Sequence, residues 1–118
     1  MKDNLTNEFL QGLEDIEIPL LGMSFKRKSF LEKGFAYIVG YRKENNTAVD
    51  FIFGPSDWEI EIIVYTSKGK FAFKDLLQIP VIAKWVDSNR YKQINGRNIK
   101  NELLWFVELL KVSLTEIE

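Results

Sequence analysis

Apolar residues near the start of the chain are spaced as on one face of a helix. Spacings of four, four and three residues connect Leu5, Phe9, Leu13 and Ile16. This pattern predicts an amphipathic helix over residues 4–15, with Asp3 or Asn4 as its N-cap. Pro19 and Gly22 are expected to end the helix.

Residues 16–34 show no regular period, and their basic run fits either an edge strand or an ordered loop. Lys26, Arg27 and Lys28 lie between Phe25 and Phe30. Basic and aromatic side chains in one strip can bind single-stranded nucleic acid. The other interpretation is a solvated segment whose cations pair with nearby acids. Because the chain as a whole is nearly neutral, we expect no nucleic-acid partner.

From residue 35 onward the hydrophobic period changes to two, which is typical of strands. Segments rich in aromatic and β-branched residues cover 35–43, 47–53, 58–66 and 71–73. They are separated by ENN, GPSD and SKGK, which are turn-forming compositions. Links this short imply antiparallel neighbours, so we expect a meander of about four strands.

Two further helices are expected after the strands. Pro80 suits the first turn of a helix that runs to about Asn89. After a polar link, Asn98 caps a final helix over residues 99–116, whose core stripe consists of Ile99, Leu103, Phe106, Leu110, Leu114 and Ile117. The predicted fold is one α+β domain over residues 1–118, an antiparallel sheet flanked by an N-terminal helix and two C-terminal helices.

The residue types that the chain lacks exclude several chemistries. It contains neither cysteine nor histidine, which removes disulfides, thiolate nucleophiles, Cys/His zinc sites and imidazole bases. We therefore expect no enzymatic activity, no cofactor and no metal site. Sixteen basic residues balance seventeen acidic ones, so no global field draws the protein to nucleic acid or to an anionic membrane.

The sequence also predicts a location. The first fifteen residues are acidic and amphipathic, unlike a signal peptide, and no stretch approaches about 18 uninterrupted apolar residues. We therefore expect a cytoplasmic protein without a membrane partner.

Strand register decides where the acidic side chains lie. A four-residue GPSD loop would place Phe53 opposite Trp58 and make one face of the two strands wholly apolar. That apolar face would pack beneath the helices. The other face would place Asp50 directly opposite Glu61, with Glu59 nearby.

The preceding hairpin, KENNTA, adds tyrosines to the acidic face. With a loop of two or four residues, Lys43 lies opposite Ala48 and Tyr41 lies opposite Asp50. The resulting candidate surface consists of Tyr37, Tyr41, Asp50, Glu59, Glu61 and Tyr65.

Three interpretations of this surface are open. Antiparallel sheets commonly leave one face in water, so the acids can simply be solvated. Tyrosines supply rigid contact area and carboxylates supply complementarity, which together suit a basic protein partner. Paired carboxylates can also bind a hard cation or share a proton, although the chain has no Asp-x-Asp-x-Asp calcium pattern. We take the six residues as a candidate partner-binding surface.

The last helix carries a second apolar patch away from its core stripe. Trp105, Leu109 and Val112 fall together at spacings of four and three. Either a neighbouring helix covers this patch, or it joins two copies of the chain in a homodimer. Trp85, with Ile82 at helical spacing, is expected in the core or between helices.

The order of motifs resembles a known group of proteins. The strings GxxYIVGYRKxN, VDFIFGPSDWEIEI, GKFAFKDLLQIPxIxKWV and NELLWFVELLK resemble the small α+β immunity-type proteins encoded beside polymorphic bacterial toxins. The resemblance is one of layout and covers most of the chain from Gly34 onward. It implies a non-enzymatic cytoplasmic protein that binds and neutralises a toxin domain.

Two functions are therefore expected as alternatives. The first is an immunity protein that neutralises a cognate toxin through the acidic and aromatic sheet face. The second is a small intracellular adaptor or structural subunit that self-associates through its C-terminal helix.

Overall fold

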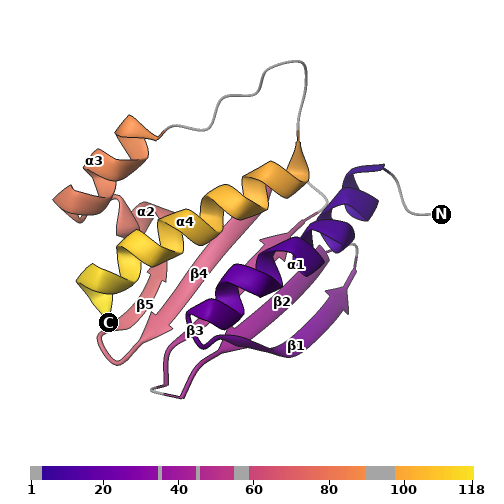
Figure 1. Cartoon of the computed structure of the whole chain (residues 1–118), viewed down its shortest axis with the longest axis horizontal. Helices are drawn as coiled ribbons and strands as arrows, with labels where there is room; N and C mark the ends of the chain where they lie inside the picture. Colours follow the sequence, from indigo (N-terminus) through magenta and orange to yellow (C-terminus); the bar gives the residue numbers. More distant parts are fainter. Residues whose placement is uncertain (1–3, 35, 45, 55–58, 90–97) are drawn as a thin grey trace.

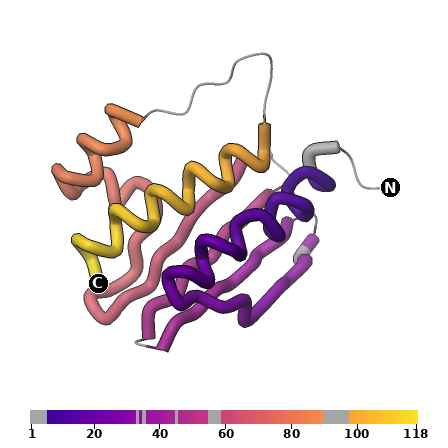
Figure 2. The backbone as a smooth tube through the Cα atoms, viewed as in Figure 1, coloured from indigo at the N-terminus to yellow at the C-terminus, as the bar shows by residue number. Residues whose placement is uncertain are grey.

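The computed structural model describes residues 4–34, 36–44, 46–54, 59–89 and 98–118 (Figure 1). In this part of the chain five strands form one antiparallel meander, in the order β1-β2-β3-β4-β5. Helices α1 and α4 lie side by side on one face of that sheet (Figures 1 and 2). The expected α+β class and the antiparallel meander are confirmed, and the sheet has one strand more than expected.

Helices α3 and α4 agree with the predicted ones, whereas α1 is longer than predicted and α2 is an addition. Their bounds are Asn4–Gly22 for α1, Phe73–Leu76 for α2, Pro80–Ser88 for α3 and Ile99–Ile117 for α4. The predicted N-cap of α4 is confirmed, because the Asn98 side chain accepts a hydrogen bond from the Asn101 backbone N–H at 3.0 Å. The four-residue α2 was not expected. No helix in the described ranges is long and apolar enough to cross a membrane.

Helix α1 continues past Pro19, so the prediction that this proline ends it is wrong. Proline removes one backbone hydrogen bond and usually costs about 3 kcal/mol inside a helix. Leu20, in the next position, is fully buried and extends the core stripe of the helix by one turn. Burial of such a side chain contributes about 1.5–3 kcal/mol, which offsets most of that cost. The helix ends at Gly22, the later of the two expected end signals and beyond the predicted bound of residue 15, and Ser24 follows it at φ 72°.

The strands include one segment that the sequence left open. Their bounds are Lys26–Lys33 for β1, Ala36–Arg42 for β2, Ala48–Phe53 for β3, Ile60–Thr66 for β4 and Gly69–Ala72 for β5. The basic run therefore lies in an edge strand that pairs with β2 and carries a β-bulge between Arg27 and Ser29. The polar link 90–97 lies outside the described residues.

Alternate residues of the central strands form the core beneath α1 and α4. In β3 these are Val49, Phe51 and Phe53, all fully buried. The Phe9 ring of α1 stacks on Phe53, with ring centroids 4.8 Å apart and planes inclined by 11°. The predicted apolar stripe of α4 is buried as well, except for the half-buried Phe106.

Helices α1 and α4 approach each other closely at Gly12. A Cβ atom at this position would lie 2.6 Å from Leu103 Cδ1 and 3.4 Å from Lys100 Cα. Leu103 is fully buried, so its methyl group has little room to move aside. Gly12 thus permits the contact between the two helices that cover the sheet.

We predict that Gly12→Ala lowers the free energy of unfolding by about 1–3 kcal/mol, because overpacking at α4 outweighs the better helix propensity of alanine. Urea unfolding followed by circular dichroism would measure the change. Gly22→Ala is the matched control, since nothing lies within 4 Å of its added Cβ. Equal stability of the two variants would contradict the close contact.

Candidate functional site

The hairpin between β2 and β3 differs from the predicted register by one residue. The Lys43 backbone N–H donates to the Thr47 carbonyl at 3.0 Å and closes a loop of three residues, with Asn46 at φ 66°. Three-residue loops of this kind use a left-handed residue before the second strand. Tyr41 consequently lies opposite Val49, and not opposite Asp50 as predicted.

A shift of one residue reverses the faces of a strand, so Tyr37 and Tyr41 point toward the helices. Their exposed fractions are 6% and 1%. The Tyr41 ring packs edge-on against Phe51 at 5.9 Å, and the Tyr37 ring lies 6.4 Å from Phe9. The prediction that these two tyrosines share a face with the acids is therefore wrong, because both belong to the core.

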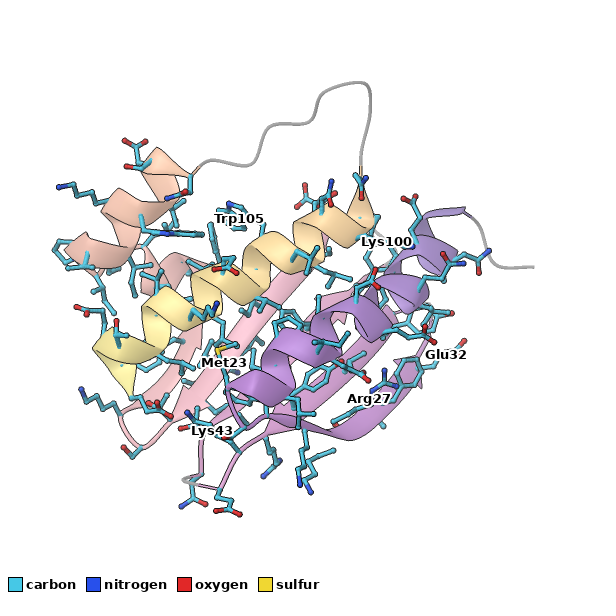
Figure 3. All side chains as sticks on the ribbon, in the orientation of Figure 1. Met23, Arg27, Glu32, Lys43, Lys100 and Trp105 are labelled. Atoms are coloured by element: carbon cyan, nitrogen blue, oxygen red, sulfur yellow. The ribbon has the colours of Figure 1, made fainter. Side chains whose placement is uncertain are left out.

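The Tyr41 hydroxyl lies in a polar cluster between α1 and β1. It donates to Glu17 Oε2 at 2.9 Å, and Arg27 Nε donates to the same oxygen at 2.7 Å. Arg27 also forms an ion pair with Glu17 through its terminal nitrogen, and Figure 3 shows it beside α1. Burial and the hydrogen bond to Glu17 raise the pKa of Tyr41 well above its usual value. One cation of the basic run thus pairs with an acid, while Lys26 and Lys28 are exposed.

The register of β3 and β4 differs from the prediction by two residues, which leaves the faces unchanged. Phe53 lies opposite Ile60, and the expected partner Trp58 is outside the described residues. Asp50 lies opposite Ile63, so it does not directly oppose Glu61 as predicted. The acidic side chains remain on the side away from the helices, but they are spread farther apart than expected.

We define the open face as the side of the sheet opposite α1 and α4, where residues of even number in β2 and β3 and of odd number in β4 lie. Ile38, Ile52 and Ile63 are half-buried there, and Leu31 of β1 is 55% exposed. Among these apolar residues stand the polar side chains of Asp50, Glu61 and Tyr65. Exposed Glu59 immediately precedes β4.

Polar groups from three strands converge over Gly40 on the open face. Tyr65 donates a long hydrogen bond of 3.2 Å to Asp50 Oδ2. A Cβ at Gly40 would lie 2.5 Å from Ser29 Oγ and 3.0 Å from Asp50 Oδ1. Partial burial and the Asp50 carboxylate raise the pKa of Tyr65. A glycine inside a strand often marks a position that neighbouring atoms approach closely. Gly40 is therefore the sequence signal for the place of Ser29 in this group, which the sequence analysis did not predict.

This arrangement supplies acceptors and apolar contact area to another molecule. In the ranges that the structure describes, no three acidic side chains gather closely enough to hold a metal ion. Asp50 and Glu61 present carboxylates beside isoleucine side chains, a mixture that suits contact with a polar and partly cationic surface.

The second candidate patch, on α4, is covered by neighbouring helices. The Trp105 ring lies 5.5 Å from Trp85 of α3 and 6.3 Å from Phe73 of α2, and its indole N–H donates to the Asn89 carbonyl (Figure 3). Leu109 is fully buried and Val112 is half-buried. Of the two alternatives for this patch, packing against a neighbouring helix is the one observed, and Trp85 lies between helices as expected.

Comparison with known proteins gives no match. No family model fits the sequence, and neither curated proteins nor solved structures show significant similarity to it.

The raised pKa of Tyr41 predicts a loss of stability in alkaline solution. Below about pH 10 the tyrosine is neutral in both states. Above that value the unfolded chain loses the proton first, so the free energy of unfolding falls as the pH rises. Tyr41→Phe should cost about 1 kcal/mol at pH 7, and its difference from the wild type should shrink above pH 10. Urea unfolding between pH 7 and 11 measures this difference, and a constant difference would contradict the prediction. Leu109→Ala, which removes no ionisable group, is the control, and its difference from the wild type should not change with pH.

The burial of Leu109 predicts that this residue stabilises the monomer. Leu109→Ala should lower the free energy of unfolding by about 2–5 kcal/mol, and adding Trp105→Ala should lower it further. Leu104→Ala is the matched control on the same helix, because Leu104 is 38% exposed and should cost much less. If Trp105→Ala with Leu109→Ala leaves unfolding unchanged but dissolves an oligomer in light scattering, the patch joins two copies instead.

Proposed function

We propose that this protein is a non-enzymatic binding protein that recognises a partner protein through the open face of its sheet. The observation that carries the proposal is the composition of that face. Half-buried isoleucine side chains lie on the open face beside Asp50 and Glu61, and α1 and α4 leave this side of the sheet uncovered. Contiguous apolar surface flanked by charged residues is typical of contact sites between proteins.

Within this class, we propose an immunity role in the cytoplasm, in which the protein neutralises a cognate toxin domain. The support is the resemblance in layout from Gly34 onward, and the carboxylates of the open face favour a toxin with a basic surface. The alternative, self-association through the C-terminal helix, has less support, because Trp105 and Leu109 pack within the monomer.

Genetic context tests the immunity role directly. The proposal expects a neighbouring gene for a large secreted protein with a toxin-like C-terminal domain. Co-expression of that domain with this protein should rescue growth. A neighbourhood of metabolic or regulatory genes only would contradict the immunity role.

The open face is tested by removing its charges. Asp50→Asn, Glu59→Gln and Glu61→Gln together should leave folding intact and weaken the complex with the toxin domain by about tenfold, with less dependence on salt. Titration calorimetry at low and high salt would measure both effects. Glu14→Gln, Asp15→Asn and Glu108→Gln form the matched control, because these exposed acids lie on helices. Unchanged affinity of the first variant would exclude this face.

A further inference from the structure

A groove of about 800 Å³ at one end of the sheet is lined mainly by cations. It lies where α1 ends and where the loop between β2 and β3 turns (Figure 1). Among the lining residues that the structure describes, Glu44 is the acid, and the basic ones are Lys26, Lys28, Arg42 and Lys43. We call this site the basic groove.

Three of these cations have no acid partner in the described ranges. Lys43 is engaged, since its Nζ lies 2.8 Å from Glu118 Oε2. Lys26, Lys28 and Arg42 are exposed, and none of them forms an ion pair within the part of the chain that the structure describes. Three unpaired cations against the one acid of the lining leave the basic groove with an excess of positive charge.

Two of the unpaired cations lie directly opposite each other. Lys26 of β1 pairs with Arg42 of β2 in the antiparallel register. Both side chains lie on the open face, because the next pair along, Arg27 and Tyr41, faces α1. Like charges in direct opposition destabilise a sheet. Lysines protect edge strands from aggregation, but Arg42 lies in β2 between two paired strands, so edge protection does not account for this pair.

The acids of the open face do not neutralise this end of the sheet. Glu61 lies at the level of Ile38, which is four residues from Arg42 in β2. At about 3.3 Å per residue the separation is about 13 Å, beyond the screening length of about 8 Å at physiological ionic strength. Asp50 is closer, but it accepts a hydrogen bond from Tyr65. The open face therefore has a basic end and an acidic end.

The basic groove favours an extended acidic ligand over a compact phosphate. Phosphate sites in proteins commonly use glycine-rich loops or helix N-termini. Helix α1 reaches this groove with its C-terminus, where the helix dipole is negative. Leu21, which is 59% exposed, and Ala48 add apolar contact area among the cations. Separate cations with apolar surface between them complement a peptide whose carboxylates are spaced along its chain.

Nucleic acid fits the basic groove less well. Proteins that bind single strands stack the bases on exposed aromatic rings. The described lining contains no aromatic residue. Phe25 is buried, and Phe30 pairs with Val39, so its ring lies on the helix side of the sheet. An acidic segment of a protein is therefore the ligand that this surface fits best.

We propose that the basic groove binds an acidic segment of the partner protein, while the acidic end of the open face contacts a basic part of the same partner. Carboxylates placed between Lys26 and Arg42 relieve the repulsion of this pair on binding. This inference rests on the proposed binding function and adds that the partner carries charges of both signs. Its test uses a peptide and does not require the toxin domain.

A labelled peptide of ten glutamates with capped ends is the probe. At about 20 mM salt it should bind with a dissociation constant below about 1 mM, and at about 200 mM salt it should bind at least about fivefold more weakly. The amide NMR signals of Lys26, Lys28 and Arg42 should shift during the titration. A peptide of ten lysines should leave those signals unchanged. Absence of binding by the glutamate peptide would overturn the proposal.

Charge variants locate the site. One triple variant replaces the unpaired cations of the groove, as Lys26→Gln, Lys28→Gln and Arg42→Gln. It should bind the peptide at least about tenfold more weakly, and its melting temperature should not fall, because an opposed pair of cations is removed. The matched control changes the net charge equally at exposed lysines outside the groove, as Lys68→Gln, Lys74→Gln and Lys84→Gln. Equal affinity of the two triple variants would overturn the proposal.

A single variant serves if the triple variant does not fold. Lys28 is the extra residue of the β-bulge and opposes no residue of β2. Lys28→Glu should therefore preserve folding and weaken peptide binding at least about fivefold. Lys84→Glu on α3 is the matched control and should bind as the wild type does. Unchanged affinity of Lys28→Glu would contradict the assignment of the groove.

Two competitors separate the ligand classes. A ten-nucleotide oligothymidylate should bind at least about threefold more weakly than the glutamate peptide, because the described lining has no ring on which its bases stack. Equal or tighter binding would assign the groove to nucleic acid and overturn the proposal. Pyrophosphate should not displace the peptide at equal concentration, and displacement would assign the groove to a small phosphate ligand instead.

The outcomes for the two proposals remain distinguishable. Peptide binding that survives while no toxin domain binds would refute the toxin role and retain the basic groove. Loss of peptide binding with an intact toxin complex would refute only the groove.

Discussion

The backbone hydrogen bond from Lys43 to Thr47 determines which side of each strand faces the helices. It closes the β2–β3 loop with Asn46 in the left-handed region, and this geometry sets the alternation that the rest of the sheet follows. Tyr41 enters the core as a result, and Asp50 stays outside. One turn thus determines both the composition of the core and that of the open face.

The polar cluster around Tyr41 is a consequence of that register. A tyrosine turned into the core must find a partner for its hydroxyl, and Glu17 of α1 accepts its hydrogen bond. Arg27 of β1 compensates the carboxylate charge at the margin of the sheet. The cluster connects a helix, an edge strand and a central strand, and its cation comes from the basic run, for which pairing with a nearby acid was one of the two expected roles.

The sequence predicted element types well, because hydrophobic period depends on local positions. It also placed Asp50 and Glu61 on the outer face of β3 and β4, since an error of two residues in register preserves the faces. The placement of Tyr37 and Tyr41 was wrong, because an error of one residue does not preserve them. The register of β2 and β3 depends on the length of the loop between them, and the sequence KENNTA does not determine that length. Helix α1 is also longer than predicted. Its last turn is stabilised by the burial of Leu20, which depends on tertiary packing and not on local sequence.

The close contact at Gly12 joins α1 to α4, which lie far apart in the sequence. During synthesis, α1 leaves the ribosome long before α4 exists, so its apolar stripe has no helical neighbour until residues 99–117 emerge. Contacts between such distant segments form late and slow folding. A nascent chain that contains the whole sheet still lacks one of the two helices that cover it, and it exposes core residues that a chaperone can bind. The synthesis of α4 therefore sets how long those core residues stay exposed.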